Sequence, residues 1–299
     1  MLSPSDIEPK LLRTLCDEGY GLEQVRFTTG RPDRHTLALR TRTGIPVVAK
    51  LYPSGGGELA YANMQAAWSS SFGERRQPPG LPRPLDYLSP AGVLVMERLE
   101  GRPLAELADP QQKNLEDSIR LLAALHSSDA QPARRRNSRA IVRSVKRKAE
   151  RIAEIAPRFV AMIRPVVAAL EAVRADDTEL VPSHGDFSAR NILVGPGRLA
   201  LIDWDRFQWA DPARDVAYIG TYSWVSALRR GHRPDWSGLK RAVRQYESIR
   251  PGVSLDAQLG FHVAAGLMRM VCSLVELWPQ EASVVPKLAA EALRYLDKR

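Results

Sequence analysis

The sequence is poor in cysteine, with only Cys16 and Cys272 among its 299 residues. Two thiols so far apart provide neither a disulfide framework nor the repeated ligand pairs of a zinc site. This excludes a small disulfide-stabilised fold, and it favours a reducing compartment. We therefore expect the protein in the cytoplasm.

Long uninterrupted apolar runs are also missing. The first ten residues, MLSPSDIEPK, contain no apolar segment of the kind found in a signal peptide. The longest mainly apolar segment, residues 261–278, contains His262, Arg269 and Glu276. We interpret it as a buried helix rather than a membrane span, and expect no membrane partner.

Acidic residues are the minority among charged groups: 34 Asp and Glu stand against 43 Lys and Arg, for a formal net charge of +9. Nine of the basic residues, with a single Glu, lie between residues 132 and 151. Ile141, Val145 and Ile152 recur there at helical spacing, which predicts an amphipathic helix with a solvated basic face. An acidic peptide or an anionic metabolite bound to residues 134–151 is the alternative. A nucleic-acid partner is not expected, because no zinc finger, RNA-binding aromatic motif or basic zipper accompanies the charge.

The pattern of apolar residues divides the chain into two parts. Before about residue 98, short β-branched runs broken by Gly and Pro predict an antiparallel sheet with one helix. After about residue 110, helical periodicity dominates. The predicted strands are 25–30, 35–44, 45–52, 85–88 and 92–99, and the predicted helices are 58–70, 111–128, 138–175, 212–230, 237–248, 256–278 and 281–298. We predict an α+β chain with an N-terminal lobe of residues 1–98 and a helical C-terminal lobe of residues 99–299.

Two short motifs contain the residues most suited to chemistry, HGDFSARNIL at 184–193 and LIDWD at 201–205. Phosphoryl transfer needs a carboxylate beside the acceptor hydroxyl and hard oxygen ligands for Mg²⁺. Asp186 meets the first need, and Asn191 with Asp203 meets the second. The apolar segments on either side of GPGR predict a hairpin with Asn191 and Asp203 side by side at its open end. A polar loop between buried strands is the structural alternative.

Together these motifs resemble the catalytic signature of the aminoglycoside phosphotransferase and choline kinase family, whose members are relatives of protein kinases. The resemblance covers about residues 20–225. It implies a two-lobed protein-kinase-like fold, with a small antiparallel-sheet N-lobe that binds nucleotide and a larger helical C-lobe that holds the acceptor. It implies that Asp186 is the catalytic base and that Asn191 and Asp203 are metal ligands. His184 resembles the structural His that braces the loop, and no second His or Cys at ligand spacing supports a metal role for it.

The resemblance also suggests residues that bind the nucleotide. Lys50, in VVAKLY, occupies the place of the strand lysine that contacts the α- and β-phosphates in kinase folds. Glu58 is its expected partner, although a Glu in a first helical turn also interacts favourably with the helix dipole. Thr29 and Gly30 belong to the expected phosphate-covering loop, for which a plain surface hairpin is the alternative.

Further positions follow from the same resemblance. The backbone of Glu97 and Leu99 lies where the adenine-binding hinge is expected. Asp215, in DPARDVA, is expected to accept hydrogen bonds from the backbone of the catalytic loop, and Asp211 to cap a helix. His126 is interpreted as a packing residue.

Three alternative roles are open for Asp205: it orients Arg206, it caps a turn, or it faces the acceptor. We favour a structural role for it.

The implied cofactors are ATP, or GTP in its place, and Mg²⁺; the acceptor stays open. Residues 206–246 contain only three acids, which argues against a polycationic aminoglycoside, and their aromatic residues favour packing over a choline cage. We expect a hydroxyl of a small molecule or natural product, antibiotic-like, ahead of a Ser or Thr of a peptide precursor, with choline-like amines last. A non-catalytic protein that binds nucleotide or peptide is the other class. It is disfavoured because the expected base, metal ligands and lysine are all present.

Overall fold

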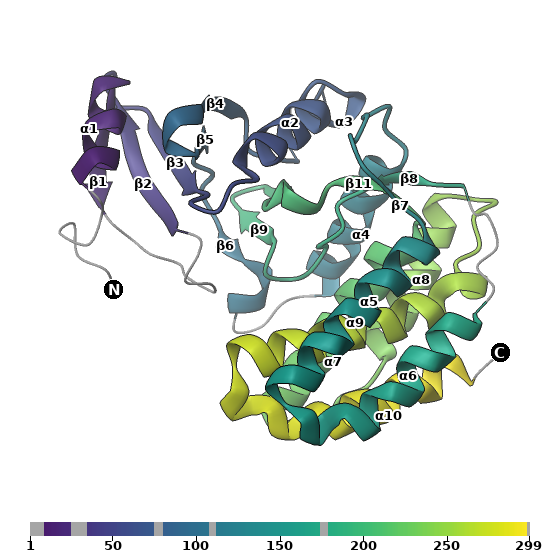
Figure 1. Cartoon of the computed structure of the whole chain (residues 1–299). Helices are drawn as coiled ribbons and strands as arrows, with labels where there is room; N and C mark the ends of the chain where they lie inside the picture. The colour runs from purple at the N-terminus through teal and green to yellow at the C-terminus, as the bar shows by residue number, and fades with distance from the viewer. Residues whose placement is uncertain (1–8, 25–34, 75–79, 108–111, 174–178, 298–299) are drawn as a thin grey trace. The chain divides into compact units, whose positions relative to one another are not determined.

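The computed structural model describes residues 9–24, 35–74, 80–107, 112–173 and 179–297 (Figure 1). The chain divides into two compact units, which are Met1–Arg102 with Leu193–Arg206, and Pro103–Ile192 with Phe207–Arg299. The segment Leu193–Arg206, placed by the sequence in a C-terminal lobe of residues 99–299, belongs instead to the first unit.

An antiparallel sheet of five strands forms the first unit, in the order β1-β2-β3-β5-β4. Its strands are β1 (Tyr20–Gln24), β2 (His35–Thr41), β3 (Pro46–Leu51), β4 (Pro84–Leu88) and β5 (Val93–Glu97). The predicted antiparallel N-terminal sheet is thereby confirmed. The predicted strand at 25–30 lies outside the described residues, and β1 comes before it.

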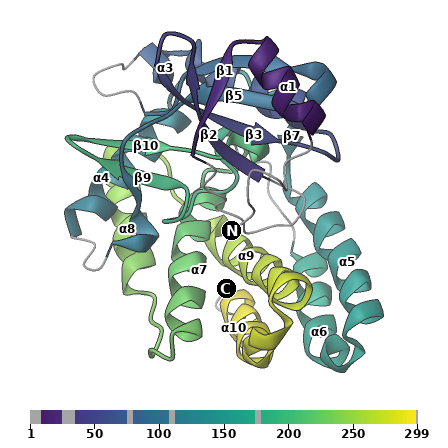
Figure 2. The same ribbon diagram turned by 90° about the vertical axis from the view of Figure 1, so that its left-hand side faces the viewer.

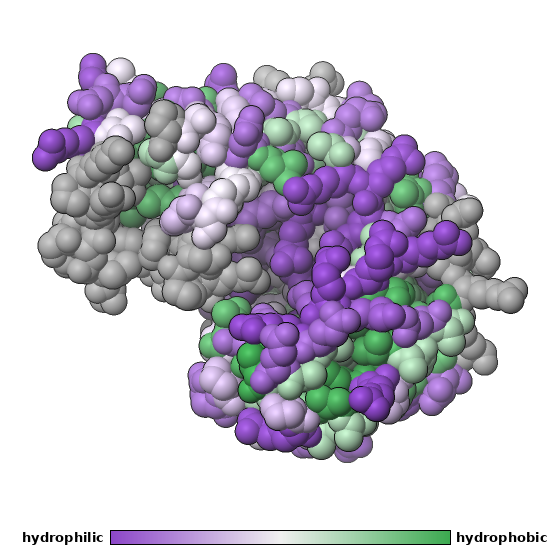
Figure 3. Space-filling view, in the orientation of Figure 1, coloured by the Kyte–Doolittle hydropathy of each residue, from purple (hydrophilic) through white to green (hydrophobic). Residues whose placement is uncertain are grey.

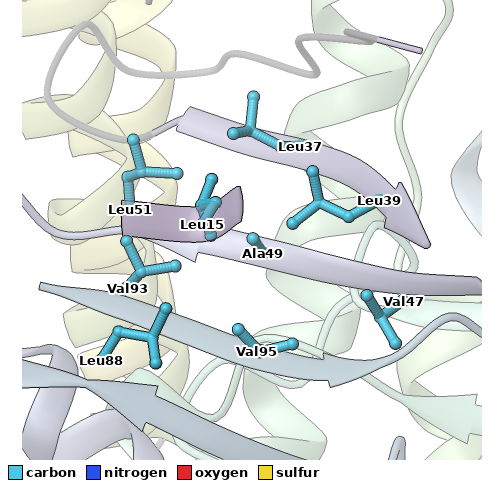
Figure 4. Close-up of a cluster of buried hydrophobic side chains, with 9 residues drawn as sticks. All are labelled: Leu15, Leu37, Leu39, Val47, Ala49, Leu51, Leu88, Val93 and Val95. Atoms are coloured by element: carbon cyan, nitrogen blue, oxygen red, sulfur yellow. The ribbon is translucent and has the colours of Figure 1, made fainter. Parts of the chain in front are cut away.

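Alternation along β3 sets which side chains enter the core. Val47, Ala49 and Leu51 are buried on one face of the strand, and Lys50 alternates with them onto the other face. The buried face belongs to a cluster that includes a helix not predicted from sequence, α1 (Pro9–Asp17). Figure 4 shows the cluster: Leu15, Leu37, Leu39, Val47, Ala49, Leu51, Leu88, Val93 and Val95.

The first unit also contains α2 (Gly57–Trp68), α3 (Ser71–Glu74) and the hairpin of β9 (Ile192–Gly195) and β10 (Arg198–Leu201). Helix α3 was not predicted from the sequence. Short 3₁₀ turns occur at η2 (Ser89–Ala91) and η5 (Trp204–Arg206).

Backbone and side-chain contacts explain why the hairpin belongs to this unit. The backbone N–H of Leu201 donates to the carbonyl of Gly80 (2.8 Å), and the Asn63 amide donates to the carbonyl of Trp204 (3.0 Å). Gly101 has a φ of +144°, and a Cβ there would lie 2.8 Å from the carbonyl oxygen of Val194. Only glycine therefore allows the chain to approach the hairpin so closely.

Among the described residues, seven long helices make up most of the second unit, and they confirm the predicted helical C-terminal part. They are α4 (Gln112–His126), α5 (Ser138–Ile155), α6 (Val160–Ala172), α7 (Ala213–Arg229), α8 (Ser237–Ile249), α9 (Asp256–Leu277) and α10 (Val285–Leu296). Three 3₁₀ turns accompany them: η3 (Leu104–Glu106), η4 (Pro157–Phe159) and η6 (Pro279–Val284).

The predicted helix 138–175 is interrupted in the structure. Ala156 has φ −150° and ψ 65°, outside the helical region, and separates α5 from η4 and α6. The cause is Pro157, because proline disfavours the helical conformation of the residue before it.

Helix α9 is the centre of the second unit, where it packs against α5, α6, α7 and α10 (Figure 2). Among the described helices it is the one long and apolar enough to cross a membrane, yet 72% of its apolar window is buried inside the protein. Burial of this kind is typical of a core helix.

A small sheet positions the HGD motif. β8 (Val181–Ser183) leads directly into it and pairs antiparallel with β11 (Gln208–Ala210), which pairs parallel with β7 (Arg135–Arg136). The chain passes from the first unit to the second at β6 (Arg102–Pro103).

We expect Leu39→Ala to lower the free energy of unfolding by about 2–5 kcal/mol, because it leaves a cavity in the core of the sheet. Leu39 is fully buried, whereas Ile45, at the end of the same hairpin, is 57% exposed. Urea denaturation measures both effects, with Ile45→Ala as the control. Equal losses for the two variants would contradict this description of the core.

Candidate active site

The loop after β8 is buried from His184 to Ser188 and brings three of the predicted site residues together. The backbone N–H of Asp186 donates to Nδ1 of His184 (3.3 Å). The side-chain amide of Asn191 donates to the backbone carbonyl of Asp186 (2.9 Å). His184 and Asn191 therefore hold the backbone of Asp186 from both sides.

Asp215, in the first turn of α7, holds the same loop from outside it. Its carboxylate accepts hydrogen bonds from the Ser183 hydroxyl (2.9 Å), the His184 N–H (2.8 Å) and the Gly185 N–H (2.9 Å). The residue is completely buried. Consecutive backbone donors that converge on one fixed carboxylate determine the path of the chain into Asp186.

His126 extends this network, although the sequence suggested only a packing role for it. Its Nε2 lies 3.2 Å from the Asp215 carboxylate, and its Nδ1 lies 2.7 Å from the Tyr246 hydroxyl. Arg250 donates to the same hydroxyl (3.0 Å). These contacts are consistent with a neutral ring that donates from Nε2 and accepts the Tyr246 proton at Nδ1. Helices α4, α7 and α8 are thus connected to the loop by buried polar contacts.

The pKa values support these protonation states. Burial lowers the pKa of His126 despite the neighbouring carboxylate, and burial raises the pKa of Tyr246 to about 12. Burial alone would raise the pKa of Asp215, but its hydrogen bond with His126 and the nearby positive charges outweigh that effect and lower it. Asp215 is therefore ionised at neutral pH and acts as an acceptor only.

A cation that sequence reasoning missed contacts the predicted base. Arg269 of α9 forms an ion pair with Asp186 (2.7 Å) and donates to the carbonyl of Gly185 (3.1 Å). Its guanidinium lies over the ring of Tyr218, 4.2 Å from the centroid, and Arg214 also donates to the Gly185 carbonyl (3.3 Å). The available signal was an arginine inside an otherwise apolar helix.

In the first unit, Lys50 meets the two aspartates of the LIDWD motif. Its Nζ lies 2.7 Å from Asp203 and 2.9 Å from Asp205, and the Tyr52 hydroxyl donates to Asp205 (2.6 Å). Burial alone would lower the pKa of Lys50, but the two carboxylates more than compensate and raise it. The lysine is therefore a fixed positive charge beside Asp203.

These contacts correct the prediction that Glu58 is the partner of Lys50, and they show what Asp205 contacts. Glu58 is exposed in the first turn of α2, and among the described residues the partners of Lys50 are Asp203 and Asp205 instead. Asp205 is thus a partner of Lys50 and Tyr52.

Asp203 has an unusual backbone. Its φ of +68° is the only positive value of a non-glycine residue in the described chain. Such a conformation is costly for a residue with a Cβ and occurs mostly where the surroundings impose it, often at functional sites. The side chain is 28% exposed, so solvent or a ligand reaches it.

The donor set suits Mg²⁺. Asp203 offers a hard carboxylate oxygen. The side-chain nitrogen of Asn191 donates to the backbone of Asp186, so the side-chain oxygen of Asn191 is the atom that suits the metal. Among the described residues no three His, Cys, Asp or Glu form a metal-binding cluster. Asn191 and Asp203 belong to different units, so their predicted pairing stays a prediction.

The remaining nucleotide-binding predictions are not decided by geometry. Thr29 and Gly30 lie outside the described residues. The backbone N–H of Glu97 donates to the carbonyl of Arg83 (2.9 Å), and the Glu97 carboxylate accepts from the N–H of Arg83 (3.1 Å). Leu99 is half-buried. The hinge role of both residues stays a prediction.

Comparison with known proteins decides the family. Residues 25–250 match the model of the phosphotransferase enzyme family APH. The chain belongs to this family. It is thus a phosphotransferase of the APH type, and the predicted resemblance and enzyme class are confirmed. No curated protein sequence matches it significantly.

Solved structures show the same fold at low sequence identity. An apo thermostable mutant of aminoglycoside phosphotransferase APH(4)-Ia superposes with a TM-score of 0.68 and 15% identity, covering 98% of this chain and 100% of its own. A choline/ethanolamine kinase family protein from Mesorhizobium loti gives 0.59 and 14%, with coverages of 92% and 88%. Spectinomycin phosphotransferase APH(9)-Ia, in complex with ADP and spectinomycin, gives 0.60 and 15%, with coverages of 97% and 95%. The protein-kinase-like fold predicted from sequence is confirmed.

A buried histidine beside the site predicts a pH dependence of stability. His262 of α9 lies 3.6 Å from Asp211, which caps α7 by accepting from the Ala213 N–H (2.7 Å). Burial lowers the pKa of His262 to about 4. Its value in the unfolded chain is about 6.5.

We expect the free energy of unfolding to fall as the pH drops from about 6.5 to 4, because the unfolded chain binds a proton that the folded chain excludes. His262→Gln should flatten this slope, as measured by urea denaturation at several pH values. The control is His232→Gln, since His232 is exposed. If the His262→Gln slope equalled that of the wild type, the buried neutral histidine would not be its source.

Proposed function

We propose that this phosphotransferase transfers the γ-phosphate of ATP, with Mg²⁺, to a hydroxyl group of a small molecule or natural product, in the cytoplasm. The observation that carries the proposal is Asp186, a buried carboxylate whose backbone is fixed by His184, Asn191 and Asp215. The related spectinomycin phosphotransferase, with ADP and an antibiotic bound, supports both the nucleotide and the class of acceptor.

In this proposal the hydroxyl of the acceptor approaches the Asp186 carboxylate. The acceptor oxygen forms a bond to the γ-phosphorus while the bond from that phosphorus to the β–γ bridging oxygen breaks, and ADP leaves. Asp186 orients the hydroxyl and takes its proton. The rigid backbone of the loop supports this step, since small displacements of a catalytic group cost much rate.

The first unit supplies the contacts to the nucleotide. Lys50 is the cation for the α- and β-phosphates, and its pair with Asp203 keeps it extended on β3 before nucleotide arrives. Asp203 and Asn191 would hold Mg²⁺, which neutralises charge on the phosphates when bound. Asp205 keeps Lys50 and Tyr52 in place.

Asp186→Asn should reduce turnover by about 10²–10⁴-fold, because the amide no longer accepts the proton of the hydroxyl. Nucleotide affinity should stay within about twofold, since Asp186 belongs to the acceptor side. Both are measured with Mg-ATP and a panel of hydroxyl compounds by mass spectrometry and calorimetry. Asp297→Asn, at an exposed carboxylate, is the control. Near-normal turnover of Asp186→Asn would remove it from the role of base.

Asp203→Ala should weaken Mg-ADP binding by about tenfold or more while leaving metal-free ADP binding much less affected, because a carboxylate ligand is lost. Calorimetric titration with and without Mg²⁺ separates the two effects. Asp205→Asn is the matched comparison, since it also contacts Lys50 but is not an expected ligand. An unchanged affinity for Mg-ADP would contradict the metal assignment.

A further inference from the structure

The acceptor side of the site is rich in guanidinium groups. Arg269 contacts the catalytic carboxylate, and both Arg269 and Arg214 contact the Gly185 carbonyl next to it. A cationic acceptor brought to Asp186 would therefore meet an arginine that already lies 2.7 Å from the reacting carboxylate. Electrostatic repulsion disfavours such an acceptor.

Arg136 adds a second, independent observation. It lies in β7, which shares a three-stranded sheet with β8, the strand that enters the HGD motif. Its side chain is partly buried, and its Nε is a buried donor with no hydrogen-bond partner among the described residues. A buried N–H without an acceptor costs free energy, which a ligand oxygen would recover.

Positive charge is concentrated around Arg136. Burial lowers its pKa, and the positive charges of Arg269, Arg147 and Arg134 lower it further. Arg269 is therefore close enough to Arg136 for their charges to interact, and it is also paired with Asp186. Guanidinium groups concentrated in this way create a positive potential that favours an anion.

The exposed surface beside this cluster is also basic. Helix α5 begins at Ser138, directly after β7, and Figure 3 shows hydrophilic side chains gathered over it. Arg139, Arg143 and Arg147 are exposed on this helix. A basic surface near a site attracts anionic ligands and raises their rate of association.

We propose, building on the function proposed above, that the acceptor is an alcohol that also carries a carboxylate or phosphate group, which binds to the guanidinium groups of Arg136 and Arg269. Arginine suits this role because its planar donors match the oxygens of carboxylate and phosphate in pairs. The hydroxyl of such an acceptor lies toward Asp186, since Arg269 contacts both the anion and that carboxylate. Specificity then comes from the second unit alone.

Binding of inorganic phosphate to the full chain tests the anion site without catalysis. The chain is saturated with Mg-ADP, so that phosphate does not occupy the nucleotide site, and phosphate is titrated by calorimetry. We expect saturable binding by the wild type, weakened about tenfold or more in Arg136→Gln and only partly restored in Arg136→Lys, which keeps the charge but not the paired donors. Arg151→Gln is the control, because Arg151 pairs with Glu154 on the exposed side of α5. Equal melting temperatures would show that each variant is folded.

No saturable binding by the wild type, or equal binding by Arg136→Gln, would overturn the proposal. Paired acceptors then separate the two claims: a hydroxy acid against its methyl ester, and a sugar phosphate against the free sugar. Phosphorylation of the anionic member only, with KM raised in Arg136→Gln and kcat little changed, supports the acceptor class. Phosphorylation of a neutral or cationic acceptor with unchanged KM leaves the kinase function standing and rejects the anion. Phosphate binding that depends on Arg136, without phosphorylation of any acceptor, supports the anion site and counts against the proposed function.

Discussion

The buried carboxylate of Asp215 is the interaction on which the catalytic loop depends. It accepts from the Ser183 hydroxyl and from the N–H groups of His184 and Gly185, and it also contacts His126. A carboxylate that is completely buried is stable only when donors surround it, so this one fixes three consecutive residues at once. The position of Asp186 is the consequence, because it follows Gly185 directly. The predicted base is thus positioned by a second carboxylate, that of Asp215.

The first unit uses charge in a different way. Lys50 is partly buried between Asp203 and Asp205, and Asp203 keeps a left-handed backbone conformation. A lysine already held by carboxylates would need little reordering to meet phosphate oxygens. The second unit instead presents arginines around Asp186. In the function proposed above, the first unit meets a metal-bound nucleotide, and the arginines of the second select the charge of the acceptor.

Local sequence patterns predicted the structural features that depend on residues close together in the sequence. Short β-branched runs before residue 98 and helical periodicity after residue 110 predicted the two kinds of architecture, and the motifs predicted Asp186, Asn191 and Asp203 as site residues. Contacts between side chains far apart in the sequence could not be predicted from it. Arg269 meets Asp186 across 83 positions of sequence, and the partners of Lys50 lie in a segment that the sequence assigned to the other lobe. Pro157, by contrast, was a local signal for the break between α5 and α6 that the helical periodicity concealed.

Hydrogen exchange at the backbone amides of His184 and Gly185 tests most directly whether Asp215 holds the catalytic loop. Both amides donate to its carboxylate, so in the wild type they should exchange slowly. In Asp215→Asn they should exchange at least about tenfold faster, while amides in the middle of α9 keep their wild-type rates. Asp256→Asn, at the exposed start of α9, serves as the control. Unchanged exchange at His184 and Gly185 in a folded Asp215→Asn variant would contradict the account.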